Sequence, residues 1–134
     1  MIVVDTNLIV GLYIPGDKSE AAESVFSKDP HWTAPLLWRS EFRNVLAMGV
    51  RRKMFVLDDA CLIMEEAERL MREDEYEVPS AHILELAAQS GCSAYDCEFV
   101  ALARQLGVPL VTWDREILAA FPESSVRPER FARA

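Results

Sequence analysis

Four acidic side chains stand where a buried strand ends or where a helix presents its apolar face. They are Asp5, Glu41, Asp96 and Asp114. Acidic residues are almost never buried unless they are paired or bound to a metal. Carboxylates that converge without basic partners repel one another, and a divalent cation is the usual remedy. The sequence therefore predicts a metal-dependent site with these four acids as ligands.

Asp5 and Asp114 each follow a short apolar run, residues 1–4 and 109–113. Both runs are typical of buried strands that end in a carboxylate and lead into a helix. Open α/β sheets bind their ligands at the carboxyl ends of their strands, so both acids are expected at that edge. Either could instead be a helix N-cap, which contributes about 0.5–2 kcal/mol to stability.

Glu41 and Asp96 lie on predicted helices and share the faces that should be buried. Glu41 is four residues after Leu37 and four before Val45, and Asp96 is three residues before Phe99. Asp96 also stands three residues after a serine, which is the spacing of a capping box. Capping explains these acids singly but does not explain the four together.

Polar and basic residues near the acids add to this interpretation. Asn7 and Thr112, each two residues from an acid, are placed to orient a carboxylate or a bound water, although both also suit ordinary turn and strand positions. The net charge of −8 argues against a protein that binds nucleic acid by bulk electrostatics. A local basic strip over residues 39–53 could offset that charge, with Arg43 as the candidate substrate contact, or could be a solvated helix end.

The apolar pattern predicts strands alternating with helices along one domain, residues 1–134. We expect strands at 1–5, 31–34, 77–78, 109–113 and 125–127, and helices at 6–13, 18–28, 36–48, 58–73, 80–91, 93–107 and 114–121. Such alternation implies parallel βαβ units and a sheet covered on both faces.

Several other classes of protein are disfavoured. The two histidines and three cysteines do not have the spacing of a zinc finger, which disfavours a zinc site. No glycine-rich phosphate-binding motif is present, which disfavours a nucleotide-binding protein of that kind. No stretch approaches the roughly 18 apolar residues of a membrane span. The odd cysteine count and the absence of a basic, signal-like N-terminus favour reduced thiols and a cytoplasmic location.

The order and separation of four motifs resemble the PIN domain, and the size resembles the VapC-type toxins of prokaryotic toxin–antitoxin pairs. The motifs are Val-Val-Asp-Thr-Asn at 3–7, Glu-Phe-Arg-Asn-Val-Leu at 41–46, Ser-Ala-Tyr-Asp at 93–96 and Leu-Val-Thr-Trp-Asp at 110–114. The resemblance implies a three-layer α/β/α fold with a central parallel sheet, and Mg²⁺- or Mn²⁺-dependent endoribonuclease activity. It assigns the acidic roles to Asp5, Glu41, Asp96 and Asp114, and implies an antitoxin partner. Trp113, Cys97 and Glu98 depart from the residues usual in the family.

Three functional hypotheses remain open at this level. The first is an RNase toxin; the second is a PIN-type nuclease of RNA processing without an antitoxin; the third is a catalytically inactive RNA- or protein-binding module of the same fold. The apolar faces of helices 36–48 and 58–71 exceed what a small sheet needs to cover, which predicts a homodimer.

Overall fold

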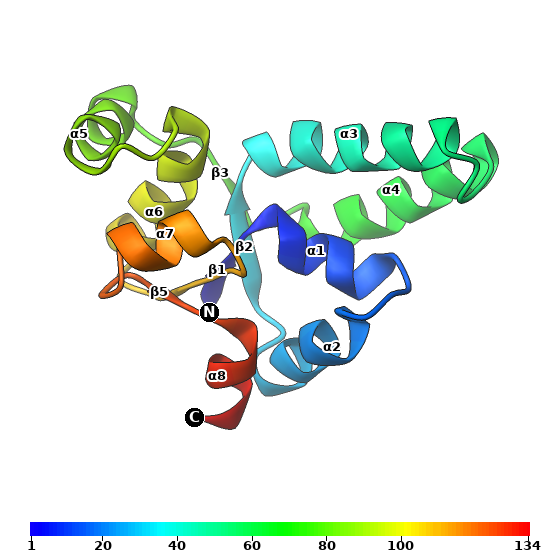
Figure 1. Ribbon diagram of the computed structural model, residues 1–134, viewed down its shortest axis with the longest axis horizontal. Coiled ribbons are helices and arrows are strands. Elements are labelled where there is room, and N and C mark those ends of the chain that lie inside the picture. Colours follow the sequence, from blue (N-terminus) through cyan, green and yellow to red (C-terminus); the bar gives the residue numbers. More distant parts are fainter.

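Five parallel strands form the centre of the molecule in the computed structural model, which describes residues 1–134 (Figure 1). Their order across the sheet is β3-β2-β1-β4-β5. The strands are β1 Ile2–Val4, β2 Trp32–Pro35, β3 Glu75–Tyr76, β4 Leu110–Val111 and β5 Ser125–Val126. The parallel pairing follows from the helical crossovers, and the predicted α/β/α class is confirmed.

Eight helices surround the sheet. In Figure 1, α1, α3 and α4 lie on one side of the central strands, while α5, α6 and α7 lie on the other. The helices are α1 Thr6–Tyr13, α2 Ser19–Lys28, α3 Leu37–Arg51, α4 Leu57–Met71, α5 Ser80–Ser90, α6 Ala94–Leu106, α7 Arg115–Ala120 and α8 Pro128–Arg133. The α3–α4 pair projects from the sheet as a helical hairpin, and α8 packs against α2. No helix is both long and apolar enough to cross a membrane.

The middle of α6 is buried on all sides and forms a large part of the core. Every residue from Phe99 to Ala103 is buried, and α6 contacts β1, β2 and β4. Cys97 on the same helix is a buried free thiol, in agreement with its expected place in the core. This burial holds the first turn of α6, which carries Asp96, against the sheet.

Several elements differ from the sequence prediction. Helix α3 extends to Arg51 rather than to 48, and β4 covers only Leu110–Val111 of the predicted 109–113. Strand β3 lies at Glu75–Tyr76, two residues before the predicted 77–78, because its register is set by pairing with Ala34 and Pro35 of β2. Helix α4 begins at Leu57, one residue before the predicted 58, and ends at Met71 rather than at 73. Helix α8 was not predicted, because it follows Arg127, which makes no capping hydrogen bond, whereas the Asp114 cap marks the start of the equally short α7.

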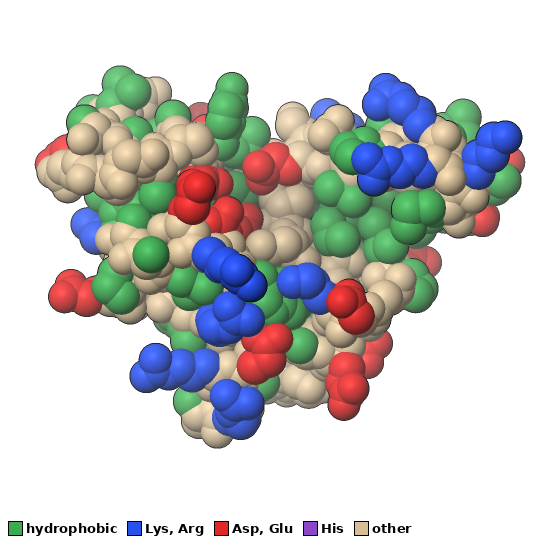
Figure 2. All heavy atoms as spheres, viewed as in Figure 1, with side chains coloured by type: hydrophobic (Ala, Val, Ile, Leu, Met, Phe, Trp, Pro, Cys, Tyr) green, Lys and Arg blue, Asp and Glu red, His purple; other side chains and the backbone are tan.

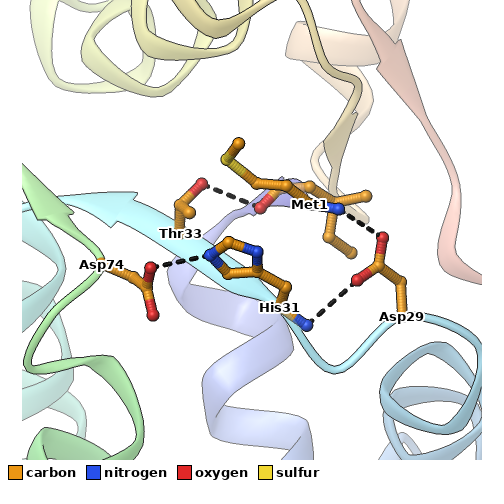
Figure 3. A network of polar contacts seen from close by, with 6 residues as sticks. Met1, Asp29, His31, Thr33 and Asp74 are labelled. Carbon is orange, nitrogen blue, oxygen red and sulfur yellow. Dashed lines mark hydrogen bonds and ion pairs between the residues drawn. The ribbon is translucent and has the colours of Figure 1, made fainter.

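A polar network ties β1 to β2 at their amino ends, the edge of the sheet opposite to Asp5 (Figure 3). The amino group of Met1 donates to Asp29 Oδ2 at 2.8 Å, and His31 N–H donates to Asp29 Oδ1 at 3.0 Å. The His31 ring contacts Asp74 at 2.8 Å, and the Thr33 hydroxyl donates to Ile2 O at 2.8 Å. This histidine is therefore structural and lies away from the acids.

Arg39 of α3 fastens β3 to the rest of the sheet. Its guanidinium donates to both oxygens of Glu75, and to Glu68 at 2.7 Å, while the Trp38 indole also donates to Glu75 at 2.8 Å. Burial alone would raise the pKa of Glu75, but the hydrogen bonds from Arg39 and Trp38 hold it below its usual value. Arg39 is thereby committed to structure and is not free to contact a substrate.

We expect Arg39→Met to lower the free energy of unfolding by about 3 kcal/mol, because the Glu75 side chain, only 7% exposed, would lose its charged partner. Urea denaturation checks this. The double variant Arg39→Met/Glu75→Gln should recover most of the loss. Arg43→Met, an exposed arginine one turn further along α3, is the control and should change stability by less than about 0.5 kcal/mol. Equal losses for the two single variants would contradict the role of the Arg39 ion pairs.

Candidate active site

The four predicted acids line one open cleft of about 540 Å³ at the carboxyl ends of β1 and β4. Asp5 follows β1, Asp114 lies beyond β4, and Glu41 and Asp96 reach the cleft from α3 and α6. Figure 2 shows acidic side chains gathered in the hollow at the centre of this face. Residues up to 109 positions apart in the sequence thus meet at the edge where open α/β sheets bind ligands.

Asp5 both caps α1 and belongs to the cleft. Its Oδ1 accepts the Thr6 backbone N–H at 2.8 Å, and its Oδ2 accepts the Thr112 hydroxyl at 2.6 Å. The capping and site interpretations of this residue are therefore compatible. The Thr6 hydroxyl in turn donates to Glu41 Oε1 at 2.7 Å, so Thr6 orients two acids of the cleft, one through its backbone and one through its side chain.

Thr112 joins the two strand-end acids. Besides donating to Asp5, its buried hydroxyl oxygen accepts the Asp114 backbone N–H at 2.9 Å. Asp114 caps α7 by accepting the Ile117 N–H on Oδ1 at 3.0 Å. The Asn7 amide nitrogen lies 3.5 Å from the Thr112 oxygen, while Asn7 Oδ1 is buried without a hydrogen-bond partner.

Asp96 is held by its backbone rather than by its side chain. Ser93 caps α6 by accepting the Asp96 N–H at 3.1 Å. The return bond of a capping box, from the Ser93 backbone to the Asp96 carboxylate, is not formed. The Ser93 hydroxyl is the one hydrogen-bonding group that lowers the pKa of the Asp96 carboxylate, so its oxygens are otherwise available in the cleft.

Burial and mutual repulsion raise the proton affinity of three acids, Asp5, Glu41 and Asp96. Burial, with the neighbouring charges of Glu41 and Asp96, raises the pKa of Asp5 to about 7 in spite of its two hydrogen bonds. Burial also raises the pKa of Glu41, with contributions from Asp96 and Glu98. The pKa of Asp96 is raised by burial and by the charge of Asp114. These pKa shifts arise because like charges lie close together in a region of reduced solvation.

The donor set suits a hard divalent cation. The cleft offers four carboxylates and the unpartnered Asn7 oxygen, all oxygen ligands of the kind that Mg²⁺ and Mn²⁺ prefer. In the present side-chain positions no three His, Cys, Asp or Glu residues lie close enough together to share one ion. Binding a cation would therefore require side-chain rotation, for which the carboxylate of Asp96 is best placed.

The predicted substrate contact Arg43 lies elsewhere. It is exposed and lines the groove between α3 and α4 rather than the acidic cleft. Lys18, which the sequence reasoning did not select, is the single basic residue that lines the cleft. No local pattern marks Lys18, because the loop from α1 to α2 brings it there only in the folded chain.

Trp113, the residue that departs from the resembled family, explains the position of Lys18. The Lys18 ammonium lies 4.5 Å from the centre of the Trp113 ring, a cation–π contact. The Trp113 indole N–H donates to both oxygens of Glu129 in α8, at 2.9 and 3.1 Å. Thus α8 is attached to the residue that immediately precedes Asp114.

Comparison with known proteins agrees with this geometry. A model of the PIN domain matches residues 2–122. The chain is 32% identical over 124 residues to Ribonuclease VapC3 of Pyrobaculum aerophilum, covering 90% of this chain and 95% of that protein.

Among solved structures, the PAE2754 protein of Pyrobaculum aerophilum has a TM-score of 0.78 at 20% identity, covering 98% of this chain and 86% of that one. FitAcB from Neisseria gonorrhoeae has a TM-score of 0.73 at 18% identity, covering 96% and 98%. FitAB bound to an IR36 DNA fragment has a TM-score of 0.75 at 16% identity, covering 96% of each chain. These three likenesses support the fold.

Without divalent cations, Asp5→Asn should stabilise the protein at neutral pH. Because the pKa of Asp5 rises from 3.8 to about 7 on folding, the native state holds its proton more tightly than the unfolded chain. Wild-type stability should then fall as the pH rises from about 4 to 7, by on the order of 4 kcal/mol at most. The variant escapes this loss, so its advantage should grow between pH 5 and pH 8 in urea denaturation with EDTA.

Asp29→Asn is the control of opposite sign. Although burial raises its pKa, Asp29 is held below the usual value by hydrogen bonds from the N-terminal amine and from His31. Its replacement should lower stability at pH 8 more than at pH 4. If Asp5→Asn is instead less stable than the wild type at pH 8, then capping of α1 outweighs carboxylate repulsion.

Proposed function

Because this chain belongs to the PIN-domain family, we propose that it is a metal-dependent endoribonuclease and the toxin of a VapC-type toxin–antitoxin pair. The observation that carries the proposal is the convergence of Asp5, Glu41, Asp96 and Asp114 on one cleft. The ribonuclease relative, similar over most of both chains, supports RNA as the substrate.

The reaction is hydrolysis of an RNA phosphodiester by water. The four acids would hold one or two Mg²⁺ or Mn²⁺ ions, with the unpartnered Asn7 oxygen nearby. A cation bound there lowers the pKa of a water molecule and neutralises charge on the phosphate in the transition state. No serine, cysteine or histidine lines the cleft, and its one hydroxyl, that of Thr6, donates to Glu41, so water is the expected nucleophile.

Within this site, threonine side chains orient the acids, and one acid is available to accept a proton. Thr112 fixes Asp5 relative to Asp114, and Thr6 fixes Glu41 through Oε1. The second carboxylate oxygen of Glu41 receives no hydrogen bond from the protein, so it is available to accept a proton from the attacking water. Glu41 is our candidate general base, and the threonines are positioning residues.

The partners follow from the same assignment. A toxin requires a cognate antitoxin, and a net charge of −8 favours a partner segment with basic side chains. We expect the enzyme to act in the cytoplasm, where RNA is available and its three free thiols stay reduced. Co-expression with the product of an adjacent small gene separates the toxin from an RNA-processing nuclease, because only a toxin should be silenced by that product.

Asp5→Asn and Asp96→Asn should each lower the rate of RNA cleavage in Mg²⁺ by at least about 10²-fold, because each removes a charged ligand. Cleavage of a labelled RNA by the purified protein measures this. Circular dichroism and urea denaturation should show that both variants stay folded. Asp59→Asn, an exposed acid on α4, is the matched control and should cleave at the wild-type rate.

A folded Asp5→Asn or Asp96→Asn variant that cleaves as fast as the wild type would contradict the assignment of these acids. A wild-type protein that binds RNA tightly but never cleaves it, with Mg²⁺ or with Mn²⁺, would favour the inactive binding module. Loss of cleavage in EDTA and its return with Mg²⁺ would support the metal requirement.

We further propose a homodimer formed through α3 and α4. The groove between these helices, about 460 Å³, is lined mainly by apolar residues, and Leu57 at its edge is 64% exposed. An apolar surface of this kind, on a hairpin that projects from the sheet, is typical of a protein interface (Figure 1).

Light scattering at micromolar concentration should give twice the chain mass of 15.1 kDa. Leu57→Glu should shift the protein to the monomer, because a charge would be buried in the interface. Leu84→Glu, at a leucine of similar exposure on α5, should leave the dimer intact. A wild-type protein that is monomeric under these conditions would refute the dimer.

A further inference from the structure

A second cleft, lined by three arginines, lies beside the acidic one. It measures about 400 Å³ between α7, β5 and α8, and Arg115, Arg127 and Arg130 contribute to its walls. On the face drawn in Figure 2, Lys and Arg side chains gather over α7 and α8 next to the acidic hollow. In a chain with a net charge of −8, this grouping makes a local region of opposite sign.

The arginines of this cleft are free to bind a ligand. All three are exposed, and neither Arg115 nor Arg130 forms an ion pair. Arg127 approaches Glu129 only to 3.9 Å, with about half of its side chain exposed. Arg39 differs in this respect, because it is bound to two glutamates within the fold.

The arginine cleft is joined to the acidic cleft by covalent and hydrogen-bonded connections. Arg115 directly follows Asp114, which lines the acidic cleft. Trp113, directly before Asp114, holds α8 through Glu129 at 2.9 Å, so the walls of the arginine cleft keep a fixed position relative to the acids. Lys18, beneath which the Trp113 ring lies, places one further cation inside the acidic cleft itself.

We propose that the arginine cleft binds the phosphates of the RNA strand on one side of the bond that is cut. This inference rests on the proposed ribonuclease function and adds the direction in which the substrate leaves the acids. Guanidinium groups bind phosphate oxygens through paired hydrogen bonds, and such contacts set the position of a strand without reading its sequence. An acidic cleft needs cations of this kind close by, because its own charge repels the RNA backbone.

The lining favours RNA over an acidic protein segment. Only two of the seven residues around the cleft are hydrophobic, whereas an amphipathic helix needs a continuous apolar floor. The apolar groove between α3 and α4 offers such a floor at a separate place. A phosphate chain, by contrast, requires a row of cations that continues into the catalytic cleft.

The test compares Arg115→Ala/Arg130→Ala with the wild type in cleavage of a single-stranded RNA of about ten nucleotides. We expect KM to rise on the order of tenfold at 0.1 M salt, with kcat changed less than about twofold, because two phosphate contacts are lost. The slope of log(1/KM) against log[salt] should become shallower by about 1.4, at about 0.7 per contact on a single strand. Arg72→Ala, at an exposed arginine at the end of α4, is the control and should match the wild type.

A second measurement uses substrate length. A dinucleotide has only the phosphate that is cut and no flanking phosphate for the arginine cleft to bind, so the double variant should cleave it as well as the wild type does. Binding of the longer RNA to Asp5→Asn, with and without the two arginine changes, gives the affinity without cleavage. Failure of the wild type to cleave any RNA would refute the proposed function itself.

The inference is wrong if the wild type cleaves RNA and the double variant keeps the wild-type KM and salt slope. It is also wrong if the variant loses dinucleotide and longer substrates equally, since the arginines would then act on the acids. A variant that cleaves normally but no longer binds the antitoxin would assign the cleft to that protein instead.

Discussion

Carboxylates that are partly buried and repel one another form the centre of the acidic cleft. Asp5, Glu41 and Asp96 all have raised pKa values because burial and mutual charge act in the same direction. A fold that only needed stability would separate these groups or pair them with cations. Keeping them in one cleft lowers the stability of the folded protein. In an enzyme, binding of a divalent cation and a phosphate would offset this loss.

The fold limits this loss of stability because the same acids also make stabilising hydrogen bonds. Asp5 and Asp114 each cap a helix, and the Thr112 hydroxyl connects them. Hydrogen bonds to a carboxylate favour its charged form, and they oppose the repulsion at Asp5. Ser93 holds the Asp96 backbone. Capping a helix and lining the acidic cleft are therefore compatible roles of one residue at a strand end.

The arginines of the molecule differ in whether they form ion pairs within the fold. Arg39 forms ion pairs with Glu68 and with Glu75 of β3. Arg115 and Arg130, in contrast, form no ion pair and lie next to the acids. Trp113 connects the acidic cleft to α8. Its ring makes a cation–π contact with Lys18, and its indole N–H donates to Glu129 of α8. A short terminal helix that adds little to the core thus acquires a place beside the active site.

The sequence by itself determined the class of fold and the identity of the acids that meet, because both depend on local patterns. Apolar runs that end in Asp5 and Asp114 mark strand ends, and the helical period places Glu41 and Asp96 on inward faces. The tertiary structure decided the register of β3, which depends on pairing with β2, and the formation of α8, which Glu129 secures to Trp113. It also decided which cations face the acids: the sequence favoured Arg43, whereas the fold places Lys18 in the cleft and Arg115 beside it. Exposed charges follow no period, so only the packing of distant elements can determine which side chains become neighbours.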